Sequence, residues 1–326
     1  MYNLQTDLQL TTAHAEAILT AWLGRSARDT EPVSCTAIEP LSGGMINTVL
    51  RLRFDREPYT AVIKLNRPGT PFASEARILR RLHETGFPCP AVYLVDDRAK
   101  IVPYTFLLLE TLPGTSLHEV QLAPPDRDRV ERELAGALVA LHGQTRTTFG
   151  PIGETGSMSW VDVLMPDLHA IRARPEIDTR LSDAVLADVD RAIELAPGIL
   201  QDQGPPTLIH GDIWAANVIV HEADDGWHLS GLVDPSSQYA DVEMELAYLR
   251  SFNGRWDGLF EAYTTHRPLR PGYLQRWRVY WLRTYLIHVW LFGDQHYRDV
   301  TADVASQIVS ASTDGLPLTD LKGKGD

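Results

Sequence analysis

A segment of short apolar runs separated by polar loops constrains the fold of this chain more than any other. Residues 207–209 and 218–220 are apolar and rich in β-branched side chains, which predicts two buried strands on either side of a loop. Residues 229–233 predict a third strand, which follows a turn at Gly226. A loop held between buried strands is a rigid mount for side chains, so functional residues are expected on this loop.

Three polar residues of this segment are suited to phosphate chemistry. Asp212 lies within the loop, Asn217 lies at its end, and Asp234 follows the third strand directly. Magnesium prefers hard oxygen ligands and takes only one or two of them from protein, which fits the Asn217 amide and the Asp234 carboxylate. Asp212 is then left to accept a proton from a substrate hydroxyl. A simple turn at His210-Gly211-Asp212 is the alternative, but the strand–loop–strand–hairpin context favours a catalytic site.

The loop and the segments after it resemble a known family. The pattern His210-x-Asp212-x-x-x-x-Asn217, followed by Val233-Asp234-Pro235, is similar to the aminoglycoside phosphotransferase superfamily, which is protein-kinase-like in fold. The resemblance is closer to the fructosamine kinase family, whose His-Gly-Asp-Leu-Trp-x-x-Asn loop is matched at His210, Gly211, Asp212, Trp214 and Asn217. Further similar segments lie at residues 243–247, 252–254, 260–263, 268–273 and 288–293.

The resemblance implies an α+β, protein-kinase-like fold with two lobes. Residues 1–111 are expected to form a nucleotide-binding lobe, with a leading helix at 12–23, an antiparallel sheet and one main helix. Residues 112–326 are expected to form a mostly helical lobe that carries the catalytic loop, the metal loop and the acceptor site. Apolar periodicity predicts strands at 35–41, 48–54, 60–65 and 104–109, and helices at 71–84, 126–142, 160–173, 181–195, 239–252, 258–263, 273–292 and 300–308.

Residues for the nucleotide are found in the first of these lobes. Gly43 and Gly44 lie in a turn whose backbone N–H groups can approach phosphate oxygens, although two glycines between strands also make an ordinary hairpin. Lys64 ends an apolar strand, where its ammonium needs an anionic partner. Glu75 can be that partner, because in kinase-like folds a helix Glu holds the strand Lys that grips the α- and β-phosphates. The alternative for Glu75 is a solvent-facing charge on an amphipathic helix.

The resemblance also implies an adenine-binding hinge and an acceptor site. Backbone groups near Glu110 and Leu112 are expected to bond the adenine edge, since an apolar strand ends there before Pro113-Gly114. Candidate acceptor contacts are Trp214, Glu243, Glu245 and His288. Glu243 and Glu245 lie two residues apart on one predicted helix, so only one of them can face the acceptor and the other is expected to be structural.

Composition narrows the range of partners. The 326-residue chain has a formal net charge of −13, which argues against nucleic acid, because phosphate backbones need clustered Lys and Arg. Two cysteines give no disulfide framework, and neither a signal peptide nor a membrane-spanning run is seen, so we expect a cytoplasmic protein without a membrane partner. The sequence leaves the oligomeric state open between a monomer and a homodimer.

Together these features predict a kinase that uses ATP and Mg²⁺ to phosphorylate a hydroxyl group of a small molecule, most like a fructosamine (ketoamine) kinase. The Gln-x-Asn of that family's middle segment is missing here, which leaves the acceptor open. An aminoglycoside or other antibiotic phosphotransferase, or a sugar or amino-alcohol kinase, is the alternative, and an acidic acceptor site would favour the aminoglycosides. A nucleotide-binding pseudokinase is a further alternative, although Lys64, Asp212 and Asn217 are all present.

Overall fold

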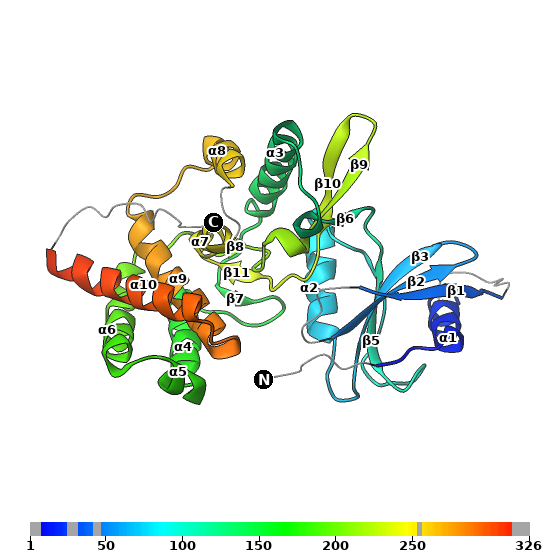
Figure 1. Cartoon of the computed structure of the whole chain (residues 1–326), viewed down its shortest axis with the longest axis horizontal. Helices are drawn as coiled ribbons and strands as arrows, with labels where there is room; N and C mark the ends of the chain where they lie inside the picture. The colour runs from blue at the N-terminus through cyan, green and yellow to red at the C-terminus, as the bar shows by residue number, and fades with distance from the viewer. Residues whose placement is uncertain (1–7, 25–31, 42–46, 253–255, 315–326) are drawn as a thin grey trace. The chain divides into compact units, whose positions relative to one another are not determined.

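The computed structural model describes residues 8–24, 32–41, 47–252 and 256–314 (Figure 1). The chain divides into two compact units. The first comprises Met1–Leu122 and Ala216–Pro235, and the second comprises Ala123–Ala215 and Ser236–Asp326. The lobe boundary that we expected between residues 111 and 112 remains a prediction. The first compact unit extends to Leu122 and also includes residues 216–235.

A five-stranded antiparallel sheet forms the centre of the first unit. Its strand order is β1-β2-β3-β5-β4. The strands are β1 (Cys35–Pro40), β2 (Thr48–Phe54), β3 (Thr60–Asn66), β4 (Val92–Asp96) and β5 (Thr105–Glu110). The four strands predicted here are confirmed within a residue at each end, whereas β4 was not predicted.

Alternation along β3 gives the two faces of this sheet different partners. Ala61, Ile63 and Leu65 are fully buried in a core that includes Ile18 and Leu19 of α1 (Thr12–Leu23). Because successive side chains of a strand point to opposite faces, Lys64 lies on the other face. That face meets α2 (Ala73–Glu84), whose buried residues are Ala76, Leu79 and Leu82. Lys64 of β3 is therefore directed at α2, where it pairs with Glu75.

A second antiparallel sheet of the first unit is built from a hairpin. β9 (Val218–Ala223) and β10 (Gly226–Leu232) form the hairpin, and β6 (Thr115–Ser116) pairs with the outer edge of β9 just before the 3₁₀ turn η1 (Leu117–Glu119). The chain passes from β5 to β6 through Gly114, which has φ +98°. A Cβ atom at this position would lie 1.9 Å from the carbonyl oxygen of Val220, so only glycine permits this close approach.

The second unit is mostly helical. The longest helices are α3 (Pro124–Leu141), α6 (Asp183–Ile199), α9 (Tyr273–Leu291) and α10 (Gln295–Asp314), and α9 is the most buried, with ten buried side chains. The shorter helices are α4 (Trp160–Arg172), α5 (Pro175–Arg180), α7 (Glu243–Phe252) and α8 (Asp257–His266). A small antiparallel sheet has the order β7-β11-β8, from β7 (Gly150–Pro151), β11 (Gln238–Ala240) and β8 (Thr207–Leu208), and the turn η2 (Ala215–Asn217) joins the units.

Two helix predictions in the second unit are wrong at their first residues. The predicted helix at 239–252 begins only at Glu243, because Tyr239 and Ala240 pair with Leu208 and Thr207 in the small sheet. The predicted helix at 181–195 begins at Asp183, where the Ser182 side chain caps it, and α5 precedes it as a separate helix. Within the described residues, no helix combines the length and the apolar character needed to cross a membrane.

Two Gly→Ala substitutions test the close approach at Gly114. Gly114→Ala is expected to lower the free energy of unfolding by about 2 kcal/mol or more, because alanine is strained at positive φ and its Cβ meets the Val220 carbonyl. Gly136→Ala, in the middle of α3 with no atom within 4 Å of the added Cβ, is expected to raise it by roughly 0.5–1 kcal/mol. Urea denaturation of both variants measures the difference, and equal effects would contradict the described packing.

Candidate active site

Lys64 lies in the first unit between two carboxylates. Its ammonium Nζ is 2.5 Å from Oε1 of Glu75 and also donates to Oδ1 of Asp234, while only 6% of the residue is exposed. Burial by itself would lower the pKa of Lys64, but the charges of Asp234 and Glu75 and their hydrogen bonds outweigh it and raise the pKa. Lys64 is therefore a cation at neutral pH, and the predicted Lys64–Glu75 pair is present.

The two predicted magnesium ligands lie at one end of the β9–β10 hairpin. Asn217 directly precedes β9, and Asp234 follows β10 after one residue. The Val233 amide donates to the Asn217 carbonyl at 3.0 Å, which holds the two chain segments together. Asp234 has φ +55°, an uncommon conformation for a residue other than glycine, and its side chain is 44% exposed.

These two residues fit magnesium by their chemistry. One amide oxygen and one carboxylate match the small number of protein ligands that Mg²⁺ takes beside phosphate and water. No group of three or more His, Cys, Asp or Glu residues that could hold a metal is found in the described part of the chain. A site built only from protein ligands, of the kind that zinc usually occupies, is thus not seen among those residues.

The predicted hinge follows β5. The Glu110 amide donates to the Ala91 carbonyl at 2.9 Å, and the Glu110 carboxylate accepts the Ala91 amide at 3.0 Å. The amide and side chain of Glu110 therefore fix the end of the sheet. The Leu112 side chain lies near Gly231 of β10, where an added Cβ would be 3.0 Å from it. Gly43 and Gly44 lie outside the described residues.

The loop with Asp212 belongs to the second unit, and its backbone is held on both sides. The His210 carbonyl accepts the Ser236 amide at 2.9 Å and the Ser237 hydroxyl at 3.1 Å. Gly211 has φ +87°, and a Cβ there would lie 2.4 Å from the Ser236 carbonyl oxygen. The glycine of the His-Gly-Asp pattern is thus required by this close approach. One carboxylate oxygen of Asp212, Oδ1, accepts the Tyr248 hydroxyl at 2.5 Å.

Glu245 braces this loop from inside the unit. Its Oε2 accepts the Gly211 amide at 2.5 Å, and its Oε1 lies 2.8 Å from Nε2 of His142. The other ring nitrogen of His142 lies 2.7 Å from the Tyr263 hydroxyl, and burial raises the pKa of this phenol. His142, Glu245 and Tyr263 are all at most 1% exposed. Glu245 therefore has a structural role, and it is not placed to contact an acceptor.

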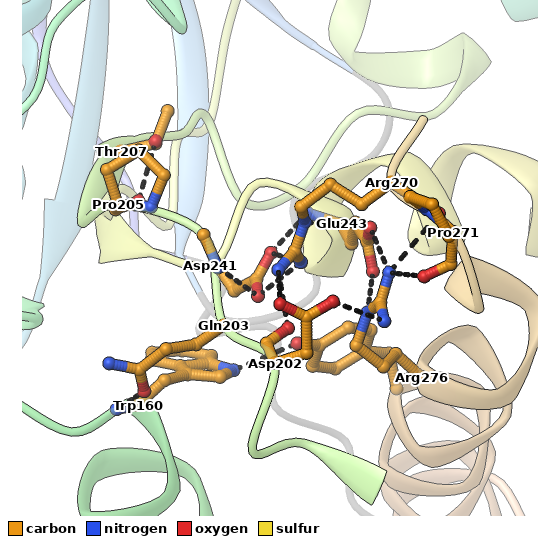
Figure 2. Close-up of polar contacts among 12 residues, drawn as sticks. Trp160, Asp202, Gln203, Pro205, Thr207, Asp241, Glu243, Arg270, Pro271 and Arg276 are labelled. Atoms are coloured by element: carbon orange, nitrogen blue, oxygen red, sulfur yellow. Dashed lines mark hydrogen bonds and ion pairs between the residues drawn. The ribbon is translucent and has the colours of Figure 1, made fainter. Parts of the chain in front are cut away.

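Glu243 belongs to a buried ionic network at the start of α7. Figure 2 shows its carboxylate facing the guanidinium groups of Arg270 and Arg276, with Asp202 beside both arginines. Arg276 donates to Glu243 at 2.6 and 2.8 Å, and Arg270 donates to Asp241 at 2.9 and 2.7 Å. Glu243 is 2% exposed. Both glutamates are thus buried and bonded to internal partners, and the expectation that one of them faces the acceptor stays a prediction.

The remaining acceptor candidates lie on more open parts of the second unit. Trp214 is 37% exposed. His288 is half-buried near the end of α9, its Nδ1 lies 2.8 Å from the Thr284 carbonyl, and burial lowers its pKa. Its ring centroid lies 4.7 Å from that of Tyr297 and 5.5 Å from that of Phe292, which is 42% exposed. These three rings contact one another at the end of α9 and the start of α10.

The predicted site residues are divided between the two units. Lys64, Glu75, Glu110, Leu112, Asn217 and Asp234 lie in the first unit, and Asp212, Trp214, Glu243, Glu245 and His288 lie in the second. Sequence reasoning missed Tyr248 and the arginines that face Glu243. Tyr248 comes three residues after Glu245 on α7, so helical spacing would have placed both on neighbouring parts of one face.

Comparisons with known proteins identify the family of the chain. The model of the phosphotransferase enzyme family matches residues 37–286. A protein of Lactiplantibacillus plantarum named as a ketoamine kinase is 35% identical over 273 residues, which cover 79% of this chain and 90% of that protein.

Solved structures share the fold. A protein of Haemophilus somnus described as a fructosamine-3-kinase superposes with a TM-score of 0.70 at 20% identity, over 90% of this chain and 96% of that one. An aminoglycoside phosphotransferase in complex with AMP-PNP and hygromycin B superposes with a TM-score of 0.64 at 20% identity, over 92% and 99%. At this identity the likeness concerns the fold alone, which is the predicted α+β, protein-kinase-like fold.

Breaking the ionic network at α7 tests the structural role of Glu243. Glu243→Gln is expected to lower the free energy of unfolding by about 3 kcal/mol, because it removes the nearest carboxylate from the buried Arg276 guanidinium. Glu194→Gln is the matched control, since the Arg191–Glu194 pair has side chains 57% and 65% exposed and should contribute less than about 1 kcal/mol. Similar urea midpoints for the two variants would show that Glu243 is not part of a buried network.

Proposed function

Because the chain belongs to the phosphotransferase enzyme family, we propose that it is a small-molecule kinase that transfers the γ-phosphoryl group of ATP to a hydroxyl of a ketoamine such as a fructosamine. The observation that carries this proposal is the buried Lys64 between Glu75 and Asp234, in the unit that also contains Asn217. A cation held in this way is suited to phosphate oxygens, and the residues beside it are suited to magnesium.

Donor binding is assigned to the first unit. Lys64 contacts the α- and β-phosphates, and Glu75 keeps the ammonium in place. Asn217 and Asp234 would hold Mg²⁺, which when bound neutralises phosphate charge. Since the amide of Glu110 already bonds Ala91, we assign the adenine edge to the Glu110 carbonyl and the Leu112 amide. Such a reaction depends on ATP, so we place the enzyme in the cytoplasm.

Acceptor activation is assigned to Asp212 in the second unit. Its carboxylate orients the acceptor hydroxyl and takes the proton as the acceptor oxygen bonds the γ-phosphorus. The bond from the γ-phosphorus to the bridging oxygen breaks, and ADP leaves. The transition state of phosphoryl transfer is loose, so position and charge supply the rate enhancement, and no covalent enzyme intermediate is required.

The charge state of the second unit supports a ketoamine over a polycationic acceptor. Asp241 and Glu243 are neutralised by Arg270 and Arg276, and Glu245 is bonded to His142. An aminoglycoside needs carboxylates that remain available to its ammonium groups, whereas these three are buried and paired inside the protein. The relatives named as ketoamine kinases support the same acceptor class.

An aminoglycoside is the second candidate acceptor, because the fold is shared with an aminoglycoside phosphotransferase. A direct test gives the purified protein ATP and Mg²⁺ with one fructosamine, one free sugar, one amino alcohol and one aminoglycoside, and identifies phosphorylated products by mass spectrometry. We expect the fructosamine to have the highest kcat/KM. Preference for the aminoglycoside would overturn the acceptor assignment, and no product with any acceptor would favour a nucleotide-binding module.

Replacing Asp212 by Asn tests the assignment of the base. Asp212→Asn is expected to lower kcat by roughly 10²–10⁴-fold, the usual contribution of a general base. The affinity for Mg·ATP should stay within about twofold, because the donor ligands lie in the other unit. Steady-state kinetics and calorimetric titration with a non-hydrolysable ATP analogue measure the two effects. Unchanged turnover would exclude Asp212 as the base.

A further inference from the structure

A phenol hydroxyl is bonded directly to the proposed base. The Tyr248 hydroxyl donates to Oδ1 of Asp212 at 2.5 Å, and both residues belong to the second unit. Burial and the neighbouring charge of Asp212 raise the pKa of Tyr248, so the phenol is protonated near neutral pH and acts as the donor. Asp212 is therefore the acceptor of this hydrogen bond, and the bond favours the ionised form of its carboxylate.

The position of Tyr248 is fixed by the anchoring of α7. At the first turn, Glu243 is held by Arg270 and Arg276 (Figure 2). One turn before Tyr248, Glu245 accepts the Gly211 amide, and the indole of Trp281 donates to the Ala247 carbonyl at 2.7 Å. The helix thus cannot rotate without breaking buried contacts, and it contacts the catalytic loop at two successive residues, Gly211 and Asp212.

We propose that Tyr248 is a positioning residue for phosphoryl transfer: it holds one oxygen of the Asp212 carboxylate, so that the carboxylate is kept in one orientation and in its ionised form for the acceptor hydroxyl. The inference rests on the proposed role of Asp212 as the base. A hydrogen bond to the charged form of an acid favours that form, and fixing its rotamer removes the entropy of orienting it during the reaction. Tyr248 acts through Asp212 and does not itself transfer the proton.

The titratable groups near Asp212 include the His210 imidazole on the same loop, whose Nδ1 accepts the Asp212 amide at 3.3 Å. Besides Asp212 on the loop, the charged or titratable groups that act on Tyr248 are Arg283 of α9 and Tyr297 of α10. Arg283 is paired with Asp167 at 2.5 Å, and burial raises the pKa of Tyr297. The ordinary pKa of tyrosine lies far above the acid range, so Tyr297, whose pKa is raised further, does not contribute to an acid limb.

The test compares Tyr248→Phe with a matched control in the kinase assay with a fructosamine acceptor. Tyr248→Phe keeps the ring and removes the donor, so kcat should fall about 10-fold or more, and the acid limb of the kcat–pH profile should move up by about one pH unit. KM for ATP should stay within about twofold. Tyr280→Phe is the control, because it removes another buried phenol of this unit, bonded to Trp160, and should leave the acid limb in place.

A second substitution separates positioning from folding. Tyr248→Gln offers an amide N–H to the same carboxylate, so its acid limb should lie closer to wild type than that of Tyr248→Phe. If Tyr248→Phe does not fold, the same comparison is made with Tyr248→Leu, which also removes the donor, and wild-type kcat with an unmoved acid limb in that variant would overturn the proposal. Wild-type kcat and an unmoved limb in Tyr248→Phe would also overturn it, as would a rise in kcat, since the hydroxyl would then obstruct the base.

Failure of this inference is distinguishable from failure of the proposed function. If wild-type protein phosphorylates no acceptor, or if Asp212→Asn retains full turnover, then the proposed function fails whatever Tyr248 does. If wild type is active, Asp212→Asn is inactive and Tyr248→Phe behaves as wild type, then the kinase assignment stands and the role of Tyr248 is wrong.

Discussion

The ion pairs of the buried Lys64 ammonium hold the proposed donor site together. An unpaired charge in this position would be strongly destabilising, so two carboxylates must be brought to it. Glu75 joins α2 to β3, and Asp234, 170 positions away in sequence from Lys64, joins the β9–β10 hairpin to the same strand. One cation thereby connects three segments of the first unit, and these are the segments that supply the assigned phosphate and magnesium ligands.

The second unit meets a similar requirement with helix α7. Its first turn is held in a buried ionic network, and its next turn braces the loop through Glu245 and Tyr248. Buried ion pairs contribute little net stability when compared with apolar packing, but breaking one is costly, so they fix geometry more than they add stability. Glu245 of α7 therefore holds the loop that carries Asp212, while Glu243 anchors the start of the helix.

Local patterns predicted most of the fold, and the errors lie where tertiary pairing overrides them. Alternation in β3 predicted both the strand and the inward Lys64, and the need of a buried cation for an anion predicted Glu75. Tyr239 and Ala240 fit the pattern of a helix start, yet they pair in strand β11. Local patterns could not predict this pairing, because the partners at 207–208 are distant in sequence. The glutamates of α7 looked like acceptor ligands because nothing local shows that Arg270, Arg276 and His142 would neutralise them.

A kinase of this kind transfers the γ-phosphoryl group of ATP to a hydroxyl of the acceptor. This transfer can be followed by mass spectrometry of the products formed from ATP labelled with ¹⁸O at the γ-phosphate, a fructosamine and Mg²⁺. We expect a phosphorylated fructosamine that carries the three non-bridging labelled oxygens, while its ester oxygen is unlabelled and derives from the acceptor. Labelled inorganic phosphate beside unmodified fructosamine, or no release of ADP, would contradict it.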